Sequence, residues 1–277
     1  MTPLPISAIS PRVDIFADKT HAAAAAAAAA SAIIRSCIKR RQRARIMVGT
    51  GNSQIEMIGF LAREPGIDWR QVEAFHLDEY VGIAENHPAA FRHWIRQRFA
   101  ELVRPKTINY LEGDAPNLRE MTEHYGRLLL AAPIDLAFVG IGENGHVAFN
   151  DPHAADFADT AIVKRVTLDA ACRQQQVGEG HFPSLASVPR EAVTVTCPGL
   201  VRAEHWICCV PDGRKAQAIR GALEGPVSPA CPGSLVQSHP DAALFLDAAS
   251  AALLSPAYVA AKCRWHAPNA AIGQRTD

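Results

Sequence analysis

Short apolar runs alternate along the chain with longer segments in which apolar residues recur at helical spacing. The short runs predict strands at 12–16, 45–48, 72–77, 107–111, 134–140, 162–166, 192–196, 205–210 and 243–246. The longer segments predict helices at 21–34, from Ser53 onward, at 88–99 and at 118–131. Strands that alternate with helices are typical of a parallel sheet covered on both sides. The pattern therefore predicts an α/β fold with an open, mostly parallel sheet and helices on both faces, in a three-layer, Rossmann-like arrangement.

The segment 22–30 consists of consecutive alanines. Alanine has the highest helix propensity, and its small side chain lets a helix approach a neighbouring element closely. The stretch is too short and too weakly apolar to span a bilayer, and Lys19 and Arg35 bracket it, so we expect a packed helix. No clear linker or repeat interrupts the chain. The sequence therefore predicts one domain over residues 1–277, with a loose tail from about residue 261.

A glycine-rich loop follows the strand predicted at 45–48. Its residues are Gly49, Thr50, Gly51, Asn52 and Ser53. Because a helix is predicted to begin at the end of this loop, its backbone N–H groups and the helix dipole would form an anion site. The loop is neither a Walker motif nor a complete dinucleotide fingerprint, since it lacks the Gly-Lys-Ser/Thr ending and the third glycine.

Polar residues also follow two other predicted strands. The strand at 72–77 is followed by DEYVG, which begins at Asp78, and the strand at 134–140 leads into the loop GENGHVAFNDP, which contains His146. Ligands bind at the carboxyl ends of parallel strands, so these side chains are candidates for acid–base chemistry. Acidic residues also cap helices and occupy turns, and each segment alone is compatible with a structural role.

The composition limits the classes of partner. Lys plus Arg and Asp plus Glu number 28 each, so no global basic field attracts nucleic acid and any phosphate site must be local. The 7 cysteines are scattered without a Cys-x-x-Cys pair, which is typical of reduced thiols in a cytoplasmic protein. The N-terminus lacks the basic start and long apolar region of a signal peptide, and we expect no membrane partner.

The two polar segments together resemble the glucosamine-6-phosphate deaminase/isomerase family, whose signatures are DEYVG-x-x-x-x-HP and G-x-G-x-x-GH-x-AFN. Both blocks occur here in the expected order, and the resemblance covers roughly residues 13–250. It implies a cytoplasmic aldose–ketose isomerase and deaminase that converts glucosamine 6-phosphate, or a related amino-sugar phosphate, to fructose 6-phosphate and ammonia. No cofactor is implied, the expected partner is the small phosphorylated sugar, and a homo-oligomer is left open.

The resemblance also implies roles for individual residues. Asp78 would be the base that moves a proton between C2 and C1 of the opened sugar, and His146 would open the pyranose ring. Asp151 would fix the tautomer of His146. The loop 49–53 would hold the phosphate together with Lys215, a cation at a predicted helix start, where positive charge is disfavoured unless an anion lies nearby.

Three positions depart from the family pattern. Asn144 replaces the aspartate before Gly-His, and because an amide carries no charge we expect a less basic His146. Asp151 replaces a longer glutamate and would have to reach further or act through water. In place of the arginine that the family supplies to the phosphate, the chain has Gln176, with Arg173 three residues earlier as the remaining candidate.

Other interpretations stay open at this point. 6-Phosphogluconolactonases are similar in fold and share a Gly-His loop, but they have Asp-Glu-Arg where this chain has Asp-Glu-Tyr from residue 78. A non-catalytic sugar-phosphate sensor is a second alternative, and Asn144 is the residue that supports it. A metal could bind His146 and Asp151, but no second histidine lies at i+3 or i+4 and no cysteine is near in the sequence, so we expect no metal.

Overall fold

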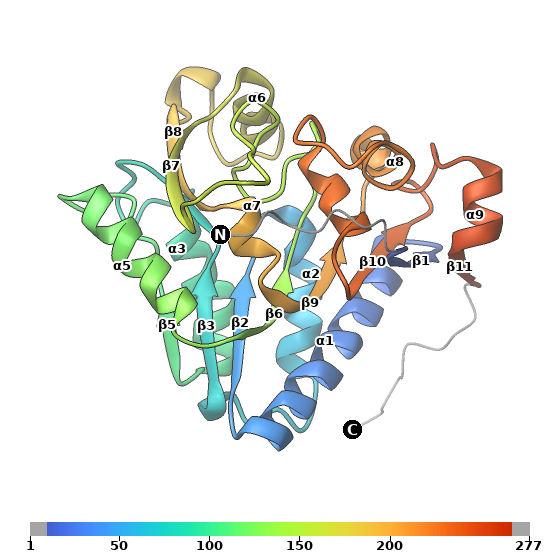
Figure 1. Cartoon of the computed structure of the whole chain (residues 1–277), viewed down its shortest axis with the longest axis horizontal. Coiled ribbons are helices and arrows are strands. Elements are labelled where there is room, and N and C mark those ends of the chain that lie inside the picture. Colours follow the sequence, from blue (N-terminus) through green and yellow to red (C-terminus); the bar gives the residue numbers. More distant parts are fainter. Residues whose placement is uncertain (1–9, 268–277) are drawn as a thin grey trace.

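Figure 1 shows a central sheet between two layers of helices, in a computed structural model that describes residues 10–267. The sheet has eight strands in the order β11-β1-β10-β9-β6-β2-β3-β5, and every neighbouring pair is parallel. Its strands are β1 (Arg12–Phe16), β2 (Ala44–Val48), β3 (Val72–His76), β5 (Thr107–Asn109), β6 (Ile134–Phe138), β9 (Ala203–Cys209), β10 (Ala242–Asp247) and β11 (Cys263–His266). The predicted parallel α/β sheet is therefore confirmed.

The helices connect these strands and cover both faces of the sheet. They are α1 (Lys19–Arg41), α2 (Asn52–Arg63), α3 (Phe91–Ile95), α4 (Glu101–Val103), α5 (Leu118–Leu130), α6 (Ala170–Gly178), α7 (Cys197–Leu200), α8 (Ala216–Glu224) and α9 (Pro256–Lys262). A π-helical segment, Arg96–Ala100, joins α3 to α4. Because a parallel connection must return the chain to the same edge of the sheet, each crossover needs such an element.

The alternation of side chains along each strand produces two separate cores. In β2, Ile46 and Val48 belong to the core that contains the buried residues of α1 and α2. Met47, between them, belongs to the core on the opposite face, which contains residues of α5 and α8. A strand that is buried on both faces has no polar side to alternate with, which explains the unbroken apolar runs in the sequence.

The alanine segment lies inside α1. The side chain of Asp18 caps the helix by accepting a hydrogen bond from the backbone of His21, and the last turn carries three basic residues that suit the helix dipole. Its buried face consists largely of Ala22, Ala23, Ala26, Ala27 and Ala30. By length and hydropathy alone α1 could cross a membrane, but it packs against β6, β9, β10 and α2 instead.

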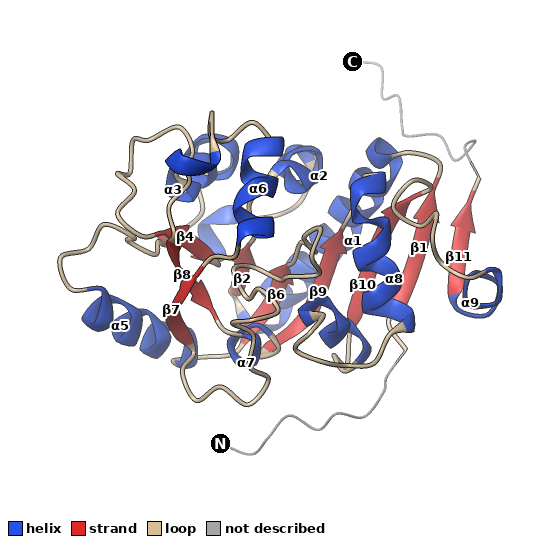
Figure 2. Cartoon of the chain, turned by 90° about the horizontal axis from the view of Figure 1, so that it is seen from above, coloured by secondary structure: helices blue, strands red, loops and turns tan. Residues whose placement is uncertain are grey.

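A second sheet of three strands lies above the carboxyl edge of the parallel sheet (Figures 1 and 2). It contains β4 (Asp78–Tyr80), β8 (Glu191–Val195) and β7 (Val163–Thr167), and all pairings are antiparallel. We expected β7 and β8 as strands of the parallel sheet, and that assignment is wrong. The pattern locates a strand but does not identify its partner, which is fixed here by contacts between residues far apart in sequence.

The loose tail expected from about residue 261 is also wrong for the described part of that segment. Ser255 caps α9, and the strand β11 pairs in parallel with β1. His266 anchors the strand, because its Nε2 lies 2.8 Å from Oδ1 of Asp14 and its ring stacks on Phe16. The residues 268–277 lie outside the described part of the chain.

The close approach of α1 to the sheet can be tested with Ala26→Leu. Ala26 is fully buried, whereas Ala28 on the same helix is exposed. The larger side chain at position 26 would force the helix away from the strands, and overpacking of this kind costs roughly 1–3 kcal/mol of unfolding free energy. Ala28→Leu is the matched control, and urea unfolding of both variants measures the difference. Equal stabilities would contradict the close packing.

Candidate active site

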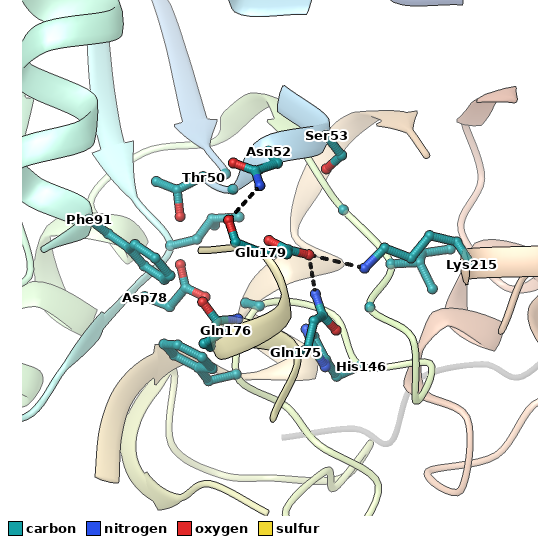
Figure 3. Close-up of a pocket in the computed structure, with 18 residues that line it drawn as sticks. Thr50, Asn52, Ser53, Asp78, Phe91, His146, Gln175, Gln176, Glu179 and Lys215 are labelled. Carbon is teal, nitrogen blue, oxygen red and sulfur yellow. Dashed lines mark hydrogen bonds and ion pairs between the residues drawn. The ribbon is translucent and has the colours of Figure 1, made fainter. Parts of the chain in front are cut away.

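A pocket with a cavity of about 70 Å³ lies at the carboxyl edge of the parallel sheet, beneath α6 (Figure 3). Its walls come from segments that are distant in sequence: the loop 49–53 after β2, Asp78 after β3, His146 after β6, Lys215 before α8, and the end of α6. The fold thus gathers in one pocket most of the residues that the sequence proposed. Parallel strands explain this, since all their carboxyl ends meet at one edge.

The loop 49–53 ends in the first turn of α2. Gly51 is the N-cap residue, with φ 96°, a conformation that favours glycine, and no side chain caps the helix. The first N–H groups of α2 are therefore available to an anion in the pocket. The helix begins at Asn52, one residue before the expected Ser53, and both residues line the pocket.

Asp78 is the first residue of β4, and only Leu77 separates it from the end of β3. Its side chain lines the pocket, although the residue is only 6% exposed. Burial, followed by the neighbouring Glu79 carboxylate, raises the pKa of Asp78 to about 8. A carboxyl group whose pKa lies near neutrality can both accept and return a proton, as a general base must.

Glu79 has a structural role beside it. Its carboxylate accepts backbone N–H groups from Tyr80, Phe91 and Arg92, and the guanidinium of Arg92 lies 3.4 Å away. These contacts anchor the first turn of α3 to the small sheet. Burial nevertheless raises the pKa of Glu79, to about 7.

His146 is held by an amide bridge. Its Nδ1 lies 2.7 Å from Oδ1 of Asn144, and the Nδ2 of that amide donates to Asp151 at 3.0 Å and to Asp169 at 3.3 Å. Since ionised carboxylates only accept, the amide must turn its N–H group toward them and its oxygen toward the imidazole. Nδ1 of His146 is therefore the protonated nitrogen, and Nε2 is left as a proton acceptor.

Asp151 supports the same histidine in two ways. It binds the Asn144 amide, and its Oδ1 also lies 3.3 Å from Nδ1 of His146. Burial favours the neutral acid, but the contacts with His146, Asn144 and the backbone of Asp169 outweigh it and lower the pKa of Asp151. The shorter side chain therefore reaches the histidine directly as well as through an amide.

A close approach to glycine sets the position of the imidazole. A Cβ atom at Gly142 would lie 2.1–2.5 Å from three atoms of the His146 ring. The glycine in this part of the loop is therefore required by the histidine that the loop carries, and any side chain there would displace it.

Lys215 is 5% exposed and is the last residue of a short 3-10 turn, Gly213–Lys215, that leads into α8. Its Nζ lies 3.4 Å from a carboxylate oxygen of Glu179 and 3.9 Å from one of Glu143. The solvated surface position that is usual for lysine does not apply here. A buried ammonium group that faces a pocket from a helix start suits the binding of an anion.

The structure does not bring Arg173 into the pocket. Its guanidinium donates to the backbone carbonyl groups of Leu185 and Val188, and it is absent from the pocket lining. Gln176, in the place of the family arginine, lines the pocket and accepts a hydrogen bond from the hydroxyl of Tyr80 at 2.7 Å. Arg173 as a phosphate ligand is therefore corrected: its guanidinium is held outside the pocket by the carbonyl groups of Leu185 and Val188.

The fold also brings Cys172, which is distant in the sequence, near His146. Potential ligand atoms of His146, Asp151 and Cys172 lie within 4.8 Å of one another. However, Nδ1 of His146 and Oδ1 of Asp151 are engaged with the Asn144 amide. Burial and the nearby carboxylates also raise the pKa of Cys172 well above its usual range, which disfavours the thiolate that binds metals. The donor set thus suits a hydrogen-bonded network better than a metal.

This arrangement of side chains coincides with a family match. The family of glucosamine-6-phosphate isomerases and 6-phosphogluconolactonase matches residues 17–245. The chain belongs to this family. It is 32% identical over 226 residues to a glucosamine-6-phosphate deaminase of Pseudarthrobacter chlorophenolicus, covering 80% of this chain and 85% of the relative. A glucosamine-6-phosphate deaminase of Oenococcus oeni is also 32% identical, over 75% of this chain and 86% of the relative.

Solved structures agree on the fold. A monomeric glucosamine-6-phosphate deaminase has a TM-score of 0.78 and 25% identity to this chain, covering 87% of it and 99% of the other chain. A 6-phosphogluconolactonase from Shewanella baltica has a TM-score of 0.71 at 15% identity, covering 87% of this chain and 100% of its own. The second likeness shows the shared fold alone, so the two activities must be distinguished by the residues of the site.

Several site residues were not predicted from the sequence. Phe91 and Gln175 line the pocket, Glu179 contacts Lys215, and Asp169 binds the Asn144 amide. Asp169 follows Asp151 by 18 positions and also caps α6. No motif marks these residues. Asp169, Gln175 and Glu179 reach the site through the packing of α6 over the pocket, and Phe91 reaches it from the start of α3.

The amide bridge predicts that Asn144→Asp is destabilising and that Asp169→Asn rescues it. An aspartate at position 144 would face the carboxylates that now accept from the amide at 3.0 and 3.3 Å. Replacing such a donor should lower the unfolding free energy by roughly 1–3 kcal/mol at pH 7. Asn144→Asp with Asp169→Asn removes one of the repulsions, and asparagine remains a good helix cap. Urea unfolding of wild type, both single variants and the double variant completes a cycle, and full additivity would contradict the bridge.

The double variant also tests the tuning of His146. A carboxylate at position 144 favours the imidazolium form, so the histidine limb of the pH–rate profile should move to higher pH. Profiles that coincide with that of the wild type would show that position 144 does not influence the histidine.

Proposed function

We propose that this enzyme opens and isomerises an amino-sugar 6-phosphate and releases ammonia, with glucosamine 6-phosphate giving fructose 6-phosphate. One observation carries the proposal. Asp78, with a raised pKa, and His146, with Nε2 as a proton acceptor, line one pocket together with Lys215 and the start of α2. An acid–base pair beside an anion site is what isomerisation of a sugar phosphate requires.

The first step is ring opening. Nε2 of His146 accepts the proton of the 1-hydroxyl group and returns it to the ring oxygen as the C1–O5 bond breaks, which leaves an open-chain aldehyde. Asn144 and Asp151 keep Nδ1 protonated throughout, so only Nε2 exchanges protons with the sugar.

Isomerisation and deamination follow. Asp78 takes the proton from C2 and delivers it to C1, while a proton leaves the nitrogen and another reaches O1, which gives a 2-imine. Water then adds to C2, the C2–N bond breaks, and ammonia leaves fructose 6-phosphate. The environment of Asp78, buried and close to Glu79, favours its uptake of the C2 proton.

A 6-phosphogluconolactonase is the alternative enzyme. The shared fold supports it at 15% identity, but the tyrosine at position 80 and the AFN run after Gly-His match the deaminase pattern. Tyr80 is buried and binds Gln176, so an arginine there would lose this packing. Ammonia release from a panel of hexosamine 6-phosphates, beside hydrolysis of 6-phosphogluconolactone, separates the two activities, and neither product would be expected from a sensor.

The proposal includes the cellular compartment and the partners of the enzyme. All 7 cysteines are free thiols, which supports a reducing compartment such as the cytoplasm. The balanced charge supports a small-molecule substrate over nucleic acid. The single domain and the absence of a membrane, metal or cofactor partner stay predictions.

Asp78→Asn should reduce turnover by about 10²-fold or more while KM changes little, because the base is lost and the shape is kept. In the wild type, kcat/KM should rise with pH up to about 8, as the carboxylate forms. Steady-state ammonia release against pH measures both effects. Near-normal turnover in the variant would exclude Asp78 as the base.

The same variant should change stability in a defined direction. The pKa of Asp78 is raised to about 8 in the folded chain, so between about pH 4 and 8 the folded state holds a proton that the unfolded state lacks. Wild-type stability contributed by this group is therefore lost as the pH rises through that window. Asparagine does not titrate, and Asp78→Asn should gain stability relative to the wild type from pH 5 to pH 8 in urea unfolding.

Lys215→Ala should raise KM for the phosphorylated sugar about ten- to a hundredfold, because a charge-assisted contact is worth roughly 1.5–3 kcal/mol. Lys39→Ala, on the exposed last turn of α1, is the matched control. Kinetics with glucosamine 6-phosphate measure the effect. If KM stays at the wild-type value in both variants, Lys215 does not contact the phosphate.

A further inference from the structure

A carboxylate lies where the proposed function places the phosphate. Glu179 is the C-cap residue of α6, and Figure 3 shows its side chain between the loop 49–53 and Lys215. Its Oε1 lies 3.4 Å from Nζ of Lys215 and accepts a hydrogen bond from Gln175 at 2.8 Å. Its backbone carbonyl accepts from the side chain of Asn52 at 3.2 Å. Both halves of the expected phosphate site thus contact one residue.

The charges in this part of the pocket are already balanced. Although burial opposes ionisation, His181, Lys215 and Gln175 lower the pKa of Glu179 to about 2, so it is an anion at neutral pH. Lys215 also faces Glu143 at 3.9 Å. The nearby guanidinium of Arg214 is engaged with Asp212. A phosphate dianion that entered beside Glu179 would meet a like charge.

The size of the cavity leads to the same conclusion. Its volume of about 70 Å³ is well below the roughly 300–1,000 Å³ of small-molecule sites. The Glu179 side chain is 8% exposed and lies between the loop 49–53 and Lys215. The cavity thus leaves little room for a hexosamine phosphate while this side chain keeps its position.

We propose that Glu179 is a specificity-determining residue that occupies the phosphate subsite and competes with the phosphate of the substrate for Lys215 and the start of α2. The inference rests on the proposed function for the identity of the substrate. A phosphate dianion has more charge and more acceptor oxygens than the carboxylate and can displace it. An uncharged 6-hydroxyl group cannot, so the internal carboxylate favours phosphorylated sugars over free ones.

Displacement of Glu179 requires a local change at the end of α6. The residue lies between Gly178 and Gly180, and Gly180 has a positive φ of 80°. The backbone hydrogen bonds that hold this turn run from Glu179 to Gln175 and from His181 to Gln176. A short rearrangement of the turn would release the carboxylate and leave the parallel sheet unchanged.

The test is the binding of inorganic phosphate at pH 7.5, measured by calorimetry without turnover. Glu179→Gln keeps the shape and removes the charge, and Glu179→Ala removes both. Each should bind phosphate about ten- to a hundredfold more tightly than the wild type, since a competing charged contact is lost. Glu123→Gln, an exposed pair with Arg119 on α5, is the matched control and should bind as the wild type does.

Equal phosphate affinity in the wild type and both Glu179 variants would overturn the proposal, whether or not the enzyme releases ammonia. Conversely, tighter phosphate binding by the Glu179 variants without any ammonia release by the wild type would support the role of Glu179 and refute only the proposed function.

Hydrogen exchange of the wild-type protein tests the same point without a variant that must fold. Saturating phosphate should speed exchange of the amides at residues 179–181, and slower or unchanged exchange there with phosphate bound would overturn the proposal.

Discussion

The site depends on the single residue that joins two sheets. Leu77 ends the run from β3, and its carbonyl accepts a hydrogen bond from Val195 of the small sheet at 2.8 Å. The chain thereby passes from the parallel sheet into β4 within one residue, and Asp78 is placed at the carboxyl edge with antiparallel strands above it. The small sheet excludes water from this carboxyl group, and that burial is the first cause of its raised pKa. Without this join the acidic pair would lie in a solvated turn.

Three carboxyl groups lie in or beside the pocket. Asp78 and Glu79 are buried, the side chain of Glu179 is only 8% exposed, and Lys215 is a buried cation in the pocket lining. The cost of removing each carboxyl group from water is offset differently. Asp78 holds a proton, Glu79 accepts backbone N–H groups, and Glu179 pairs with Lys215. Such opposed environments assign separate roles to chemically similar groups.

The substitution of Asn144 for an acid also has a structural consequence. An aspartate would place a charge beside Nδ1 of His146. The Asn144 amide instead donates to the carboxylates of Asp151 and Asp169 and accepts from the imidazole. The orientation of the histidine is retained, and the charge of Asp151 still lies 3.3 Å from its Nδ1. Loss of catalysis does not follow from this replacement, which weakens the interpretation of the chain as a sensor.

The sequence by itself determined seven of the eight strands of the parallel sheet, their order along the chain, and most of the pocket; β11 was expected to be loose. Strand periodicity and strand-end loops are local properties, and loop 49–53, Asp78, His146 and Lys215 all follow local signals. Only the tertiary structure decided that β7 and β8 leave the parallel sheet, that Arg173 faces away, and that Asp169 and Glu179 reach the site. These outcomes depend on how α6 packs over the carboxyl edge. Contacts between residues far apart in sequence fix that packing, and no periodicity within α6 records them.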